Sequence, residues 1–333
     1  MRSILVLIAF LFLTSGSAFS QTDQQLVDRY DQSVAAERYR SALKSAQDIV
    51  ERYPESATWN FNLGSMHART GGIDQAIECL QISADKGYTG VRSFEQSEDL
   101  DALRDDERFI AILKQVQSNA AARLDQFKRE AKNHNPKTHI PENIDDSPAL
   151  ILALHGTGMR GTDMYKALKD TADELNMILI APDALRPAGN GGFSWTYRDE
   201  SEWMIEHLIN QAIEEHTIDP TQIYLVGFSQ GANIALIMGQ THPDLFAGVI
   251  PICGHYEPQA ADASEDATLP PFYLLTGARD PWKKTYAHAK RDFAQADAPV
   301  KVRMIAGKGH ELPSGNAGLA ELTRAIKWCQ QQP

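Results

Sequence analysis

The chain has 333 residues, more than a typical single domain of roughly 100–200 residues, so two folded units are expected. Its 43% hydrophobic and 23% charged residues exclude a collagen-like, fully disordered or polytopic membrane protein. The net charge of −12 opposes contact with phosphate backbones, so nucleic acid is not an expected partner.

The first twenty residues have the pattern of a targeting segment. Arg2 supplies a positive charge, and Ile4–Leu13 is an apolar run too short to cross a bilayer core of about 30 Å. Small residues flank Phe19, just ahead of a cleavage point before Gln21. We therefore predict that residues 1–20 are a signal peptide, and that the mature protein is exported, either to the periplasm or as a secreted protein, without a stable membrane span. An uncleaved anchor is the alternative.

The chain contains three cysteines, Cys79, Cys253 and Cys329. The odd number leaves at least one free thiol in an exported protein, and so few cysteines exclude a disulfide-based scaffold. None of them lies in the CxxC spacing of zinc or redox sites, so neither a metal nor another cofactor is predicted.

A helical segment contains a repeat-like motif. Leu63-Gly64-x2-His67 is followed by Ala76-x3-Leu80. Small residues at Gly64 and Ala76 would let two antiparallel helices approach closely. The motif resembles the tetratricopeptide repeat, although His67 and Leu80 replace aromatic residues of that pattern.

The resemblance implies an all-α tetratricopeptide-like domain over residues 21–130. Its repeats would cover 23–56 and 57–90, with a degenerate third unit in 91–130. Such a module docks a protein or peptide partner, or serves as a helical support with no ligand, and the sequence leaves both interpretations open.

A second pattern begins after residues 131–148, a polar, Pro-interrupted stretch that reads as a linker or an edge strand. In residues 149–333, short apolar runs alternate with helical stretches, which favours a mostly parallel, doubly wound sheet covered on both faces. The predicted strands are 149–154, 177–181, 223–226, 247–252, 271–276 and 300–305. The predicted helices are 161–175, 200–216, 231–241, 283–297 and 315–330.

The pentapeptide Gly227–Gly231 has the form G-x-S-x-G, with Ser229 at its centre. The buried-strand run Ile223–Val226 precedes it and a helical run follows. This setting is typical of a nucleophile elbow, a strained turn whose flanking residues must be glycine to avoid clashes. The turn would expose the serine hydroxyl at a helix N-terminus.

Three other motifs lie in loops that follow predicted strands. His155-Gly156-Thr157-Gly158 follows the strand 149–154. Asp280 lies in a Gly-containing turn after the strand 271–276, and His310 lies in a Gly-rich loop after the strand 300–305.

Residues 149–330 resemble the α/β-hydrolase superfamily in these motifs and in their order. The elbow and the His155–Gly158 loop resemble those of phospholipase/carboxylesterase and dienelactone-hydrolase relatives. Secreted polyhydroxyalkanoate depolymerases and feruloyl esterases are similar at the same motifs. The resemblance implies a catalytic triad of Ser229, Asp280 and His310. It also implies an oxyanion hole formed by the backbone N–H groups of Thr157 and Gln230.

The sequence therefore predicts an exported serine hydrolase that cleaves a small carboxylic ester through an acyl-enzyme intermediate. Trp195 and Trp282 are candidates for lining the substrate pocket. The alternatives are a thioesterase or a serine peptidase with the same triad. A further alternative is a binding protein that acts through its repeats and carries the hydrolase fold as a scaffold.

Overall fold

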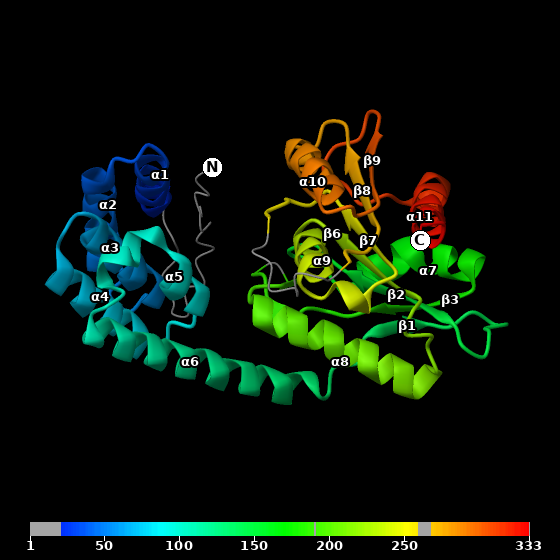
Figure 1. Cartoon of the computed structure of the whole chain (residues 1–333), viewed down its shortest axis with the longest axis horizontal. Helices are drawn as coiled ribbons and strands as arrows, with labels where there is room; N and C mark the ends of the chain where they lie inside the picture. Colours follow the sequence, from blue (N-terminus) through cyan, green and yellow to red (C-terminus); the bar gives the residue numbers. More distant parts are fainter. Residues whose placement is uncertain (1–20, 190, 259–267, 333) are drawn as a thin grey trace. The chain divides into compact units, whose positions relative to one another are not determined.

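The computed structural model describes residues 21–189, 191–258 and 268–332 (Figure 1). The predicted signal peptide lies outside these residues. The chain divides into two compact units, residues 1–127 and 128–333. Each unit is described by itself below.

The first unit is helical throughout its described part. Its helices are α1 (Gln21–Ala35), α2 (Tyr39–Arg52), α3 (Ala57–Arg69), α4 (Ile73–Asp85), α5 (Val91–Gln96), the 3-10 helix η1 (Glu98–Leu103) and α6 (Glu107–Ala131), whose last residues belong to the second unit.

Helices α3 and α4 pack closely and run antiparallel. The Ser83 hydroxyl donates to the carbonyl of Ala57 over 2.7 Å, at one end of the pair. At the crossing, a Cβ on Gly64 would lie 2.8 Å from Cγ of Leu80, and Ala76 is fully buried. The close helix approach expected from the two small residues is present. It makes a helix pair, which by itself does not identify a tetratricopeptide repeat.

The second unit is built on a seven-stranded sheet with the order β1-β3-β2-β6-β7-β8-β9. Its strands are β1 (Lys137–His139), β2 (Ala149–Leu154), β3 (Met177–Ala181), β6 (Ile223–Phe228), β7 (Gly248–Ile252), β8 (Phe272–Gly277) and β9 (Val300–Ile305). Only the edge strand β1 is antiparallel, to β3; the other pairs are parallel. A separate two-strand ladder joins β4 (Arg186–Pro187) to β5 (Phe193–Ser194).

Helices cover both faces of this sheet (Figure 1). They are α7 (Gly161–Leu175), α8 (Arg198–His216), α9 (Gln230–Thr241), α10 (Lys283–Gln295) and α11 (Gly315–Gln330). Alternate residues of each strand serve opposite faces. Val226 packs in one core with Leu168 of α7 and Ile326 of α11. On the other face, Phe272 of β8 stacks on Phe293 of α10 at 3.9 Å between ring centroids.

The predicted mostly parallel, doubly wound sheet is thus confirmed, and each of the six predicted strands and five predicted helices has a counterpart. The stretch 131–148 contributes the antiparallel edge strand β1. The short strands β4 and β5 were not predicted, because two residues carry no periodicity.

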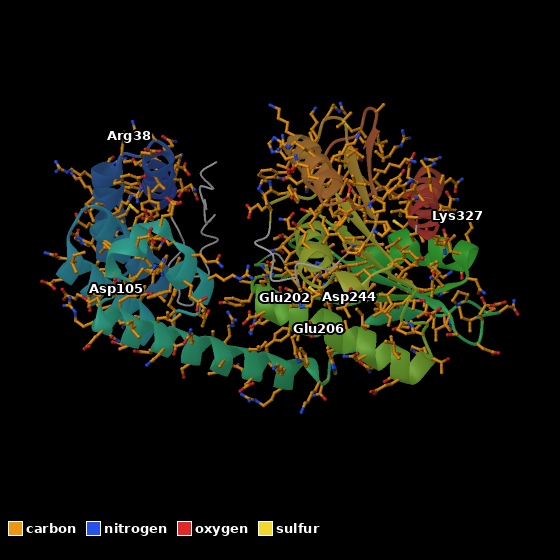
Figure 2. The ribbon with its side chains drawn as sticks, in the orientation of Figure 1. Arg38, Asp105, Glu202, Glu206, Asp244 and Lys327 are labelled. Carbon is orange, nitrogen blue, oxygen red and sulfur yellow. The ribbon has the colours of Figure 1, made fainter. Side chains whose placement is uncertain are left out.

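No helix in the described part of the chain is both long and apolar enough to cross a bilayer. Charged side chains lie at the surface of each unit, among them the exposed Asp105 and Asp244 (Figure 2).

Candidate active site

Ser229 lies in the sharp turn between β6 and α9. Its φ of 53° and ψ of −115° fall in a region that non-glycine residues rarely adopt. Its backbone N–H donates to the carbonyl of Ile252 over 2.9 Å, which ties the turn to the neighbouring strand β7. A Cβ on Gly227 would overlap the backbone of Gly231, and a Cβ on Gly231 would overlap the carbonyl oxygen of Leu154. The two glycines are therefore required by close backbone packing.

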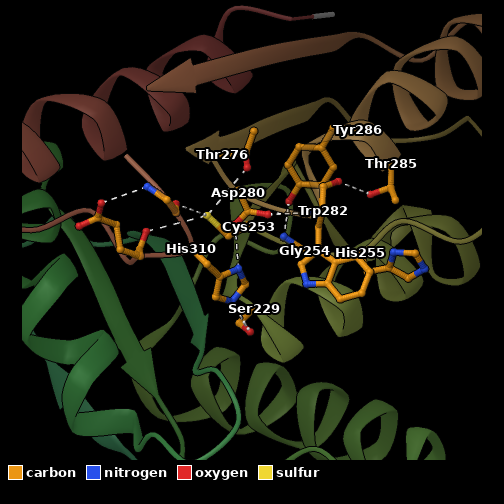
Figure 3. Close-up of polar contacts among 12 residues, drawn as sticks. Ser229, Cys253, Gly254, His255, Thr276, Asp280, Trp282, Thr285, Tyr286 and His310 are labelled. Carbon is orange, nitrogen blue, oxygen red and sulfur yellow. Dashed lines mark hydrogen bonds and ion pairs between the residues drawn. The ribbon is translucent and has the colours of Figure 1, made fainter. Parts of the chain in front are cut away.

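His310 lies between Ser229 and Asp280 (Figure 3). Its Nε2 is 2.9 Å from the Ser229 Oγ, and its Nδ1 is 2.7 Å from the Asp280 Oδ2. Because a carboxylate only accepts, Nδ1 carries the proton, and in the neutral ring Nε2 is then free to accept the serine proton. The three predicted residues form one hydrogen-bonded line.

The carboxylate of Asp280 is held from a second side. Its Oδ1 accepts the backbone N–H of Trp282 over 2.7 Å, and the residue is only 1% exposed. A buried carboxylate with a partner on each oxygen keeps one orientation. Asp280 is therefore fixed in the geometry that orients the His310 ring.

The sheet explains why residues so distant in sequence meet. Strands β6, β8 and β9 are parallel, so the turns that follow them lie at the same edge of the sheet. Two backbone hydrogen bonds join the turns after β8 and β9. The N–H of Ala278 donates to the carbonyl of Ile305, and the N–H of Arg279 donates to the carbonyl of Lys308. This contact brings Asp280 and His310 together.

The loop after β2 runs against the serine. A Cβ on Gly156 would lie 3.0 Å from the Ser229 Cβ, so a larger residue there would crowd the nucleophile. The Thr157 hydroxyl donates to the Gln230 Oε1 over 3.0 Å. The structure thus brings together the two residues whose backbone N–H groups were predicted to form the oxyanion hole. Gln230 begins α9, where backbone N–H groups have no intrahelical acceptor.

The buried side chain of His155 stabilises this loop through hydrogen bonds. The ring is fully buried, its Nε2 accepts the Ala184 N–H over 2.9 Å, and its Nδ1 bonds the carbonyl of Gly156 over 2.7 Å. Burial lowers the pKa of His155, which favours the neutral ring. Both ring nitrogens are occupied, as expected of a bracing residue.

The two candidate pocket tryptophans differ in exposure. Trp195 is 5% exposed, and its indole N–H donates to the carbonyl of His155 over 2.9 Å, so it supports the loop. Trp282 is 39% exposed and makes an edge contact with the His255 ring, with 4.8 Å between centroids. Of the two, Trp282 presents more of its ring to solvent.

Cys253 is a neighbour that the sequence analysis did not connect to the site. Its thiol, the Asp280 carboxylate and the His310 ring each offer a ligand atom within 4.8 Å of the others. Burial raises the pKa of the Cys253 thiol to about 11, however, and the other two groups already bond to each other. The cluster therefore suits hydrogen bonding better than metal binding. The available signal was position, because Cys253 directly follows β7, the strand beside β8.

Comparison with known proteins places this geometry in context. Residues 150–321 match the family described as alpha/beta hydrolase fold. Poly(3-hydroxyalkanoate) depolymerase C of Paucimonas lemoignei is 29% identical over 129 residues, which are 35% of this chain and 30% of the depolymerase. Feruloyl esterase B of Talaromyces stipitatus is 29% identical over 116 residues, which are 33% of this chain and 32% of that esterase.

The chain thus spans about a third of the length of these two relatives. Among solved structures, a Bacillus cereus carboxylesterase aligns with a TM-score of 0.49 and 18% identity, over 62% of this chain and 99% of the carboxylesterase.

Proposed function

The chain belongs to the alpha/beta hydrolase fold family, and on that basis we propose that it is an exported serine hydrolase that cleaves carboxylic esters. The observation that carries the proposal is the hydrogen-bonded line from Asp280 through His310 to Ser229, whose backbone is strained. Backbone strain at a half-buried serine whose hydroxyl bonds to a base is typical of an activated nucleophile. The names of the two relatives, a poly(3-hydroxyalkanoate) depolymerase and a feruloyl esterase, agree with this activity.

The proposed mechanism follows from the positions of the side chains. Nε2 of His310 accepts the Ser229 proton as Oγ attacks the carbonyl carbon of the ester, and Asp280 stabilises the resulting imidazolium. The backbone N–H groups of Thr157 and Gln230 bind the oxyanion. His310 then protonates the departing alcohol, and water activated by the same ring releases the acid from the acyl-enzyme.

The proposal also covers the N-terminal segment and the helical unit. Residues 1–20 direct export and are then removed. N-terminal sequencing of the exported protein tests this, and the first residue should be Gln21. The helical unit is a tetratricopeptide-like module that holds a protein or peptide partner. Its close α3–α4 pair agrees with the helix packing of such a module, and a helical support without a ligand is the alternative.

Turnover of p-nitrophenyl esters of increasing acyl length tests the proposal. The protein without residues 1–20 should hydrolyse one or more of them, and Ser229→Ala should lower kcat by about 10⁴-fold or more. The chain-length optimum reports the size of the acyl pocket. Equal activity of the Ser229→Ala variant would refute the proposal.

The same assay separates the alternatives. Faster cleavage of a matched thioester would assign a thioesterase, and cleavage of a p-nitroanilide would assign a peptidase. If no ester, thioester or anilide is cleaved, the binding-protein interpretation gains the support that the esterase loses.

A further inference from the structure

We propose that the side chain of Gln230 is a positioning device, which locks together the two segments that supply the oxyanion hole. The proposal rests on the serine-hydrolase function above. It assigns the Gln230 amide a role separate from that of its backbone N–H.

The side-chain oxygen of Gln230 is the meeting point of three donors. Its Oε1 accepts the backbone N–H of Trp195 over 2.9 Å, the hydroxyl of Thr157 over 3.0 Å and the hydroxyl of Ser194 over 3.1 Å. Its Nε2 donates to the carbonyl of Trp195 over 3.3 Å. Because Trp195 N–H only donates and its carbonyl only accepts, the amide has a single favourable orientation.

These bonds connect three separate pieces of chain. Gln230 begins α9, and Thr157 lies in the loop after β2. Ser194 is the last residue of the short strand β5, and Trp195 follows it. The last two pieces also bond to each other. Gly158 N–H donates to the carbonyl of Phe193 over 2.8 Å, and the Trp195 indole donates to His155. The two segments are thus already joined, and the Gln230 amide connects them to the helix that begins directly after Ser229. We call these hydrogen bonds of the Gln230 side chain the clamp.

Burial makes the arrangement rigid. Ser194 and Trp195 are 7% and 5% exposed, so losing the Gln230 acceptor would leave two buried donors without it. Thr157 is exposed, and its hydroxyl donates a hydrogen bond to the Gln230 side chain. The exposed end of the loop is thus held by the residue that provides the second oxyanion donor.

The consequence for catalysis is a fixed spacing of two N–H groups. The donors come from Thr157 and Gln230, 73 positions apart in sequence. Donors stabilise an oxyanion only when they are oriented before the charge develops, and a displacement of about 1 Å can cost about a hundredfold in rate. Losing the clamp should therefore weaken transition-state binding more than substrate binding.

Gln230→Met tests this, because methionine has a similar length but no comparable acceptor. We expect kcat on the best p-nitrophenyl ester to fall about 10- to 100-fold, with KM changed by less than about threefold. Gln240→Ala is the matched control. It lies on the same helix, its amide donates to the carbonyl of Leu236 over 2.8 Å, and its kcat should match that of the native protein.

Thr157→Val provides the second arm, since it removes the hydroxyl and keeps the backbone N–H. Alone, it should lower kcat by a smaller factor than Gln230→Met. Combined with Gln230→Met it should add little, because both changes break the same bond. Multiplying effects in the double variant would contradict the clamp.

Two further results would overturn the inference. One is a kcat of Gln230→Met equal to that of the native protein. The other is a lower kcat together with a higher KM and a lower Tm, which would indicate a general structural role. Failure of the proposed function has a different signature: the native protein would be inactive, or Ser229→Ala would retain its activity.

Discussion

Single residues at the proposed site are constrained by what touches them. Ser229 adopts a positive φ, which costs about 1–3 kcal/mol for a residue with a side chain. The surrounding structure enforces it, because Gly227 and Gly231 pack backbone against backbone on either side. The serine is thus presented by glycines that leave no room for a side chain.

The thiol of Cys253 should be chemically silent in the folded protein. Burial raises its pKa to about 11, so at pH 8 the reactive thiolate is a very small fraction. We expect iodoacetamide at pH 8 to leave ester hydrolysis unchanged and Cys253 unmodified by peptide mass spectrometry. Labelling in urea is the control, in which all three cysteines should react. Rapid loss of activity together with a Cys253 adduct would contradict this account.

The sequence predicted the three residues of the proposed triad, but not the hydrogen bonds that hold the neighbouring segments in place. The G-x-S-x-G motif, the strand before it and the order Ser229, Asp280, His310 are local signals. The bonds of the Gln230 amide to residues 157, 194 and 195 depend on three segments meeting in space. The contact between Cys253 and Asp280 likewise depends on strand order, which no local pattern carries.

Pairs of elements show how small residues and charges fix the packing. Helices α3 and α4 meet at Gly64, where no side chain fits without moving Leu80. Strand β9 is joined to α11 by Arg303, whose guanidinium binds both oxygens of Glu321 over 2.7 and 3.0 Å. Each contact can be tested by one substitution.

Gly64→Ala should destabilise the helical unit. Alanine favours a helix by about 1 kcal/mol over glycine, but its Cβ would lie 2.8 Å from Cγ of Leu80, and overpacking costs about 1–3 kcal/mol. We expect the steric cost to win by about 1 kcal/mol, seen as a lower Tm by circular dichroism. Glu78→Ala, at an exposed position of α4, is the control and should be nearly neutral. A higher Tm for Gly64→Ala would show that the crossing is looser than described.

Glu321 should make stability depend on pH. Hydrogen bonds from Arg303, and then Arg324, lower the pKa of Glu321 to about 2, against about 4.3 in an unfolded chain. Between these values the unfolded state binds more protons, so this contribution is complete above pH 4.3 and is lost as pH falls toward 2.

The matched experiment compares urea unfolding of Glu321→Gln and native protein at several pH values. Because both arginines are about half exposed, the deficit of Glu321→Gln at pH 7 should be about 1–2 kcal/mol. It should shrink at pH 3 and vanish near pH 2. A deficit that is constant over this range would exclude the ionised pair as its source.

Most elements of the second unit were predictable because short apolar runs alternate with helical stretches. The strands β1, β4 and β5 were less accessible, since two or three residues carry too little pattern. The antiparallel pairing of β1 with β3 depends on backbone hydrogen bonds, which cannot be predicted from a polar, Pro-interrupted segment.

The chain combines a helical unit with a unit of the alpha/beta hydrolase fold, and the boundary between them falls inside α6. The proposed chemistry uses residues of the second unit alone. Deletion of residues 21–127 should therefore leave hydrolysis of short p-nitrophenyl esters within about tenfold of the full mature chain. An insoluble product would show instead that the helical unit completes the fold of the second, and that the two cannot be separated.

Covalent labelling of the native protein with a fluorophosphonate tests whether Ser229 is a nucleophile activated by His310. We expect one adduct per chain, located on Ser229 by peptide mass spectrometry. The adduct should form far more slowly in His310→Ala, since the base that activates the hydroxyl is then missing. An unlabelled Ser229, or equally fast labelling without His310, would contradict a serine nucleophile activated by that histidine.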